Sequence, residues 1–128
     1  MIEKSTEVKT ILVVEDDVAL NKAIVLKLNK RGYTIATTFN AEDAFKVLEE
    51  NNSVVLIWLD ILLPGMNGLN FLELMRKNPL YKDKKVIVVS VSGGDDSKKR
   101  ALELGAVDYL VKSAYDLDTL VSKVVSYI

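Results

Sequence analysis

The chain of 128 residues contains no cysteine and no histidine. Without cysteine it forms no disulfide, which fits a reducing compartment, and we expect a cytoplasmic protein. Without histidine, a metal site or a catalytic centre must be built from carboxylates, hydroxyls and lysines. The composition therefore directs attention to the acidic residues and to the polar groups that accompany them.

Long apolar runs and an excess of one charge are also absent. No apolar stretch approaches the ~20 residues that cross a membrane, and the polar N-terminus, MIEKSTEVKT, is not a signal peptide. The formal net charge is −1 and no basic stretch dominates, so electrostatics gives no reason to expect contact with nucleic acid. We expect residues 1–9 to be a flexible lead-in to one domain over 10–128, with no output domain attached.

What the chain does contain is a regular alternation of two patterns. Short apolar runs rich in β-branched residues predict five strands, at 10–14, 34–37, 54–59, 85–91 and 107–111. Apolar residues at helical spacing predict five helices, at 18–30, 41–50, 69–77, 98–104 and 117–128. This alternation implies a parallel sheet with helices on both faces.

Two of the predicted helices leave details open. The third has two candidate inward faces, which are Leu69, Leu72 and Met75 or Phe71, Leu74 and Met75. The fourth follows a flexible loop at Gly93-Gly94, and Asp95, Asp96 or Ser97 could each cap it.

Polar side chains follow four of the five predicted strands. They are Glu15 and Asp16 after the first strand, Asp60 after the third, Ser90 near the end of the fourth and Lys112 after the fifth. Parallel strands end at one edge of a sheet, where open α/β sheets bind ligands, so we expect these side chains to converge. Asp60 stands out because the six apolar residues 54–59 before it read as a strand buried on both faces.

Carboxylates gathered at such an edge repel one another, by about 4 kcal/mol for each pair at ~4 Å and an effective dielectric near 20. One lysine cannot neutralise three acids, whereas a divalent cation can. An all-oxygen site suits Mg²⁺, with Mn²⁺ as an alternative. Asp60 could then attack phosphorus, as aspartates do when they form aspartyl phosphates. Ser90 and Lys112 would supply hydrogen bonds and positive charge to the phosphoryl oxygens.

Four stretches of the chain form an ordered set, which comprises ILVVEDD (11–17), LDILLPGMNG (59–68), VIVVSV (86–91) and ALELGAVDYLVK (101–112). The separations are 44 residues from Asp16 to Asp60, 30 from Asp60 to Ser90 and 22 from Ser90 to Lys112. Together these stretches and separations resemble the receiver domain of two-component response regulators, in particular the single-domain chemotaxis regulators. Any one motif is weak evidence, but the four in this order cover essentially the whole chain.

The resemblance implies a flavodoxin-like (βα)5 fold, which is an α/β doubly wound parallel sheet of five strands in the order 2-1-3-4-5. It implies that Asp60 is the phosphoacceptor, which takes a phosphoryl group from the phosphohistidine of a sensor kinase or phosphotransfer protein. Glu15 and Asp16 would be the acidic pair that binds Mg²⁺, Asp16 more directly, with the backbone carbonyl of Leu62 as a further ligand.

The resemblance also implies a switch. Ser90 resembles the hydroxyl residue that moves towards the phosphoryl group, Tyr109 the aromatic residue that turns inward with it, and Lys112 the phosphate-contacting lysine. The changed surface would comprise the fourth helix, the fifth strand and the last helix, and an unknown effector or a second copy of the chain would bind there. The domain would catalyse only its own phosphorylation and slow dephosphorylation, so we do not expect an enzyme.

Three features depart from the family pattern. Ser113 stands where a proline with a cis bond is usual. Because a cis bond before another residue type costs ~2.5–4 kcal/mol, we expect a trans bond and a different aim for Lys112. Val91 replaces the usual Ala or Gly and would crowd the phosphoacceptor. Leu62 and Ser92 occupy positions that tune phosphoryl lifetime, and an apolar Leu62 cannot orient an attacking water, which predicts slow autodephosphorylation.

Each candidate residue also has an ordinary structural explanation. The acidic run at 15–17 could simply favour the N-terminus of a helix, and Asp60 could be a turn residue before Pro-Gly. Ser90 could be a satisfied buried hydroxyl, Lys112 a solvated lysine, and Tyr109 a half-buried strand aromatic. Their joint placement at one sheet edge favours function.

Three other functions would use a similar chain. A flavin- or nucleotide-binding protein of this fold needs a Ser, Thr or Gly loop after the first strand to cradle phosphate, where this chain has three acids. A metal-dependent phosphatase with an aspartyl nucleophile usually carries a second Asp two residues on, where this chain has Leu62. A binding module that is never phosphorylated stays open because of Ser113 and Val91.

Overall fold

The computed structural model describes residues 8–91 and 94–128. Most of the predicted lead-in, the predicted lifetime role of Ser92 and the predicted flexibility at Gly93 lie outside these ranges. The described residues form five strands, five α-helices and one short 3-10 helix. These are β1 (Thr10–Val14), α1 (Val18–Lys30), β2 (Thr34–Thr38), α2 (Ala41–Glu50), β3 (Val54–Leu59), α3 (Gly68–Lys77), β4 (Lys85–Ser90), α4 (Asp95–Glu103), β5 (Asp108–Val111), η1 (Lys112–Ala114) and α5 (Leu117–Val125).

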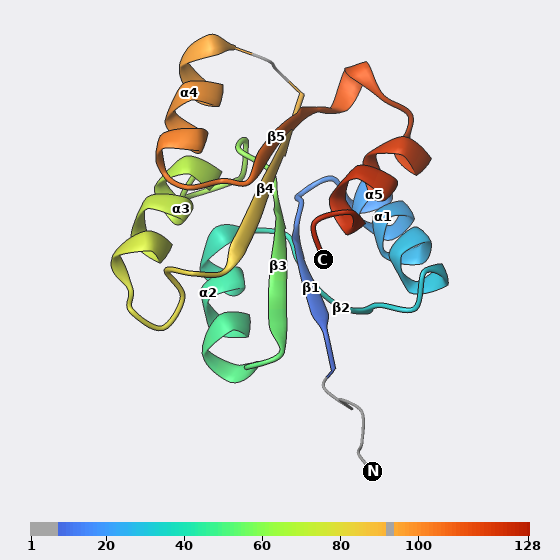
Figure 1. Ribbon diagram of the computed structural model, residues 1–128, viewed down its shortest axis with the longest axis horizontal. Helices are drawn as coiled ribbons and strands as arrows, with labels where there is room; N and C mark the ends of the chain where they lie inside the picture. Colours follow the sequence, from blue (N-terminus) through green and yellow to red (C-terminus); the bar gives the residue numbers. More distant parts are fainter. Residues whose placement is uncertain (1–7, 92–93) are drawn as a thin grey trace.

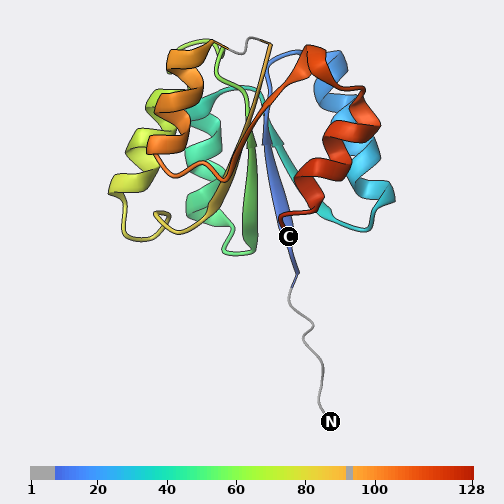
Figure 2. The same cartoon turned by 45° about the horizontal axis from the view of Figure 1, so that its top comes forward.

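The five strands form one parallel sheet in the order β2-β1-β3-β4-β5. Helices α1 and α5 cover one face of the sheet, and α2, α3 and α4 cover the other (Figure 1 and Figure 2). The predicted flavodoxin-like fold and its strand order are confirmed. The strand order reverses between β1 and β3, so the C-terminal ends of these two strands flank the crevice in which such sheets bind ligands.

Side chains of the central strands alternate between two apolar layers. Ile57 and Val88 belong to the layer shared with α2, α3 and α4, whereas Trp58 and Ile87 belong to the layer shared with α1 and α5. Every residue of β1 is buried, and so is every residue of β3 and β4 except the half-buried Val55 and the exposed Lys85. Among the described residues, the only buried charged side chains are Glu15 and Asp60, at the ends of β1 and β3.

Helix α4 begins three residues earlier than predicted, at Asp95. Its N-cap is Gly94, which offers no side-chain hydrogen bond, so the predicted capping by Asp95, Asp96 or Ser97 is wrong. Asp95 and Asp96 instead lie in the first turn, where negative side chains interact favourably with the helix dipole. The ends of β2, β4, β5 and α5 differ from the predicted ends by one to three residues.

Helix α3 begins one residue earlier than predicted, at Gly68, and Asn67 caps it by accepting a hydrogen bond from the Asn70 N–H. Gly68 packs directly against the end of β3, because a Cβ built on it would lie 2.1 Å from the carbonyl oxygen of Asp60. Glycine is therefore required here for space. The buried apolar side chains of α3 are Phe71, Leu72 and Met75, which mixes the two predicted inward faces, while Leu74 is exposed.

Candidate functional site

The acidic run after β1 divides into residues with different roles. Asp17 is the N-cap of α1, because its Oδ1 accepts a hydrogen bond from the Leu20 N–H at 3.0 Å. The Asp17 N–H in turn donates to Glu15 Oε2 at 3.0 Å. Glu15 is buried, whereas Asp16 is exposed. The ordinary explanation for an acidic run therefore holds for Asp17, and it leaves Glu15 and Asp16 available to a site.

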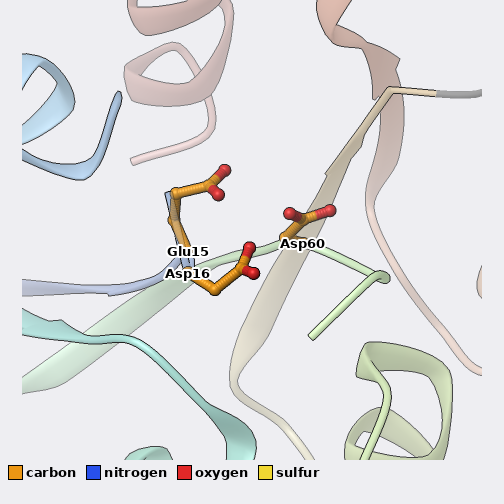
Figure 3. A group of neighbouring side chains, drawn as sticks. All are labelled: Glu15, Asp16 and Asp60. Atoms are coloured by element: carbon orange, nitrogen blue, oxygen red, sulfur yellow. The ribbon is translucent and has the colours of Figure 1, made fainter. Parts of the chain in front are cut away.

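Asp60 follows β3 and lies beside the end of β1. Its N–H donates to the Val14 carbonyl at 3.1 Å, which continues the pairing of the two strands by one residue. One carboxylate oxygen from each of Glu15, Asp16 and Asp60 lies within 4.8 Å of the others. Figure 3 shows the three carboxylates around one space at the ends of these strands. The predicted convergence of the three acids is confirmed.

Lys112 reaches the same group from η1, which follows β5. Its Nζ donates to Glu15 Oε1 at 2.5 Å and to Asp60 Oδ2 at 3.1 Å. The described residues contain no cis peptide bond, so the bond before Ser113 is trans as predicted. The lysine contacts Asp60 with this trans bond in place, and the predicted change in its aim relative to the family stays a prediction.

Burial and charge shift the pKa values of two groups here. Burial raises the pKa of Glu15 above its usual value, although hydrogen bonds from Lys112 and from the Asp17 N–H act in the opposite direction. Burial alone would lower the pKa of Lys112, but its hydrogen bond to Glu15 and the charge of Asp60 outweigh that effect and raise it. Lys112 is therefore a cation at neutral pH.

Within the acidic group, one carboxylate oxygen lacks a hydrogen-bond partner among the described residues, and the negative charges outnumber the positive one. Asp60 Oδ1 is buried and has no hydrogen-bond partner in the part of the chain that the structure describes. Buried polar atoms usually have a partner, and one ammonium cannot balance three carboxylates. Because these donors are all oxygens, the group suits a hard divalent cation such as Mg²⁺, and the residues fit a metal ion.

The other predicted site residues lie around this group at different depths. Ser90 is buried at the end of β4, in register with Val111 of β5. Tyr109 is buried in β5, on the side of the sheet that α2, α3 and α4 cover. Leu62 and Val91 follow β3 and β4, and these two residues are 63% and 54% exposed. Their proposed contributions to metal binding, switching and access stay predictions.

One residue beside the site is not identified by the sequence analysis. Asn21 is buried on α1, and its side chain hydrogen-bonds the backbone carbonyl of Glu15. The signal is present in the sequence, because Asn21 lies three residues before Ile24 and seven before Leu28, on the buried stripe of the helix. A polar residue on such a stripe indicates a buried hydrogen-bond network.

A sequence model of the response regulator receiver domain matches residues 11–125. The chain belongs to this family. Among receiver-containing relatives, the phosphate regulon transcriptional regulatory protein PhoB of Pseudomonas aeruginosa is 33% identical over 104 residues. The match covers 81% of this chain and 45% of PhoB, so the chain spans less than half the length of this relative.

Solved structures agree with the receiver assignment. A response regulator from Chloroflexus aurantiacus superposes with a TM-score of 0.82 at 28% identity, over 93% of this chain and 96% of that one. The Mn²⁺-bound form of response regulator Rcp1 gives the same TM-score and identity over 93% of each chain. No helix of this receiver domain within 8–91 and 94–128 is both long and apolar enough to cross a membrane.

Proposed function

We propose that this receiver domain carries a signal by accepting a phosphoryl group on Asp60 from the phosphohistidine of a sensor kinase or phosphotransfer protein. The observation that carries the proposal is the grouping of Asp60 with two further acids and Lys112 at one end of the sheet. Membership of the receiver family supports the choice of donor.

In the transfer, an oxygen of Asp60 forms a bond to phosphorus while the bond between phosphorus and the donor's imidazole nitrogen breaks. That nitrogen keeps the electron pair, and the donor leaves as neutral imidazole when its other ring nitrogen carries a proton. The product on this chain is an acyl phosphate. Lys112, which contacts Asp60 Oδ2, would donate hydrogen bonds to the phosphoryl oxygens.

The proposal includes a divalent cation. Glu15, Asp16, Asp60 and the carbonyl of Leu62 would hold Mg²⁺ or Mn²⁺, which supplies positive charge to the phosphoryl oxygens when bound. The acidic cluster supports this assignment, and so does the Mn²⁺-bound form of the similar regulator Rcp1.

The output of the proposed reaction is a change of surface. Ser90 would move towards the phosphoryl group and Tyr109 would turn further inward, which alters the face formed by α4, β5 and α5. An effector protein or a second copy of the chain would bind this face, without direct contact to nucleic acid or membrane. A cytoplasmic location belongs to the same proposal.

The domain is proposed to act on itself alone. It promotes its own phosphorylation and then loses the phosphoryl group slowly, because the apolar side chain of Leu62 cannot orient an attacking water. A half-life of phospho-Asp60 of only seconds would contradict this part of the proposal.

The test is incubation with Mg²⁺ and acetyl phosphate, followed by intact mass measurement. We expect one added phosphoryl group on the unchanged chain, none on Asp60→Asn, and one on the control Asp83→Asn, whose carboxylate is exposed and outside the site. Equal phosphorylation of Asp60→Asn and the unchanged chain would reject Asp60 as the acceptor. Absence of phosphorylation in all three would favour a binding module with the receiver fold.

A further inference from the structure

Asn21 places a primary amide in an apolar layer of the protein. The residue is 2% exposed, and it shares the inner face of α1 with Ile24 and Leu28. Burying an amide is unfavourable unless its hydrogen bonds are made. A leucine would pack against this apolar layer without needing any hydrogen bond. The reason for an amide at this position therefore lies in the groups to which it is hydrogen-bonded.

The partners of Asn21 join two strand ends. Its Nδ2 donates to the carbonyl of Glu15 at 2.9 Å and to the carbonyl of Thr38 at 3.2 Å. Its Oδ1 accepts a hydrogen bond from the Thr37 hydroxyl. The side chain therefore uses both amide hydrogens and its oxygen. It connects the last residues of β2 to the first residue after β1.

With the bond from Asn21, both backbone groups of Glu15 and its carboxylate are held by hydrogen bonds. The N–H of Glu15 donates to the Thr38 carbonyl at 3.1 Å, and one oxygen of its carboxylate accepts from the Asp17 N–H. The bond from Asn21 holds the remaining backbone group, the carbonyl. Because a peptide unit is planar, fixing this carbonyl fixes the plane that links Glu15 to Asp16. The direction in which Asp16 leaves the strand is set by that plane.

We infer that Asn21 is a positioning residue for the divalent-cation site. Its carboxamide holds the Glu15–Asp16 peptide so that both carboxylates face Asp60 before a cation arrives. Without this carboxamide, cation binding would have to order the Glu15–Asp16 loop, and the cost of that ordering would weaken the binding. The inference rests on the proposed function, since it assigns Asn21 a role only if the three acids bind a cation.

The expected result is a selective loss of cation affinity. Asn21→Ala should raise the Mg²⁺ dissociation constant about tenfold, the lower end of what loss of a supporting group around metal ligands usually causes. Thr37→Val is a milder variant at an exposed position, and it should raise the dissociation constant less. In the Asn21→Ala background Thr37→Val should have no further effect, because its partner oxygen is gone.

Two controls on α1 separate positioning from general destabilisation. Asn29→Ala makes the same chemical change at an exposed position of the same helix. Leu28→Ala removes buried apolar volume far from the β1–α1 loop, and so lowers stability without touching the network. We expect both variants to bind Mg²⁺ as the unchanged chain does, even though Leu28→Ala unfolds at lower urea concentration.

The measurement is an NMR titration of the full chain with Mg²⁺, using the backbone amide signals of residues 15–17, with urea unfolding of each variant alongside. Unchanged affinity in Asn21→Ala, or an equal loss in Leu28→Ala, would overturn the inference while leaving the proposed function intact. If the unchanged chain binds no Mg²⁺, the metal part of the proposed function fails, and the inference fails with it.

Discussion

Replacing Lys112 with methionine tests how far the buried acids depend on its charge. Lys112 Nζ lies 2.5 Å from Glu15 Oε1 and 3.1 Å from Asp60 Oδ2, and the side chains of the two acids are 1% and 5% exposed. Removing one partner from a buried ion pair costs about 3–5 kcal/mol, because the other charge stays buried and unpaired. We expect Lys112→Met to lower the free energy of unfolding by about 3 kcal/mol without metal, near the lower limit because methionine keeps the packing of the stem.

Lys27 provides a matched control for this substitution. Its Nζ lies 2.6 Å from Asp118 Oδ1, but these side chains are 36% and 76% exposed. Exposed ion pairs contribute about 0–1 kcal/mol, so Lys27→Met should change the free energy of unfolding by less than about 1 kcal/mol. The two variants share the chemical change and nearly the same ion-pair distance, and they differ in burial.

The assay is urea unfolding in chelator and in Mg²⁺. A ligand that binds only the folded state stabilises it by RT ln(1 + L/Kd), where L is the free ligand concentration, so the stabilisation grows as the ligand binds more tightly. Mg²⁺ should therefore stabilise Lys112→Met more than the unchanged chain, since no ammonium competes for the acids. Folding raises the pKa of Lys112, so its contribution to stability is present below the ordinary lysine pKa of 10.5 and is lost as pH rises through the folded value. Equal losses in Lys112→Met and Lys27→Met, or no loss in either, would refute the reasoning.

Two further predictions concern packing and pH. Gly68→Ala should lower the free energy of unfolding by about 1–3 kcal/mol, because its Cβ would overlap the Asp60 carbonyl. The control is Gly32→Ala, which tests backbone strain alone because Gly32 has φ +89° and no neighbour within 4 Å. Urea unfolding should show the larger loss of stability for Gly68→Ala. The hydrogen bond to Asp108 raises the pKa of Tyr127 above 10.0, so it stabilises the fold below about pH 10 and is lost as pH rises through the folded value. Tyr127→Phe should abolish that alkaline loss in a series of urea titrations from pH 8 to 11, and an unchanged profile would speak against the assignment.

The central strands β1, β3 and β4 could be predicted from the sequence because each is an apolar run that is mostly buried on both faces. The predicted bounds of β3 agree with the structure at both ends. The first residue of a helix was harder to predict from the sequence where no side chain caps the helix. The start of α4 shows this, since Gly94 precedes it and the acids that resemble caps lie in its first turn.

The acidic group could be predicted because parallel strands place their C-terminal ends next to one another, and the acids directly follow those ends. Glu15 and Asp60 follow strands that pair side by side, so their proximity follows from topology. The two contacts of Lys112 could not be predicted, because they depend on the direction of a long side chain that reaches across 97 residues of sequence to Glu15. The burial of Asn21 could be predicted from its place on the helical stripe, but its partners could not, because one of them, Thr38, lies 17 residues away on another strand.

The position of Trp58 gives this protein a built-in optical probe. It is the one tryptophan of the chain, and it lies buried in β3 two residues before Asp60. Together with the stem of Lys112 and with Tyr115, it lines a cavity of about 190 Å³ between α1 and α5. All indole emission therefore comes from one environment that adjoins the lysine, so a displacement of that stem changes the light emitted by an unlabelled chain.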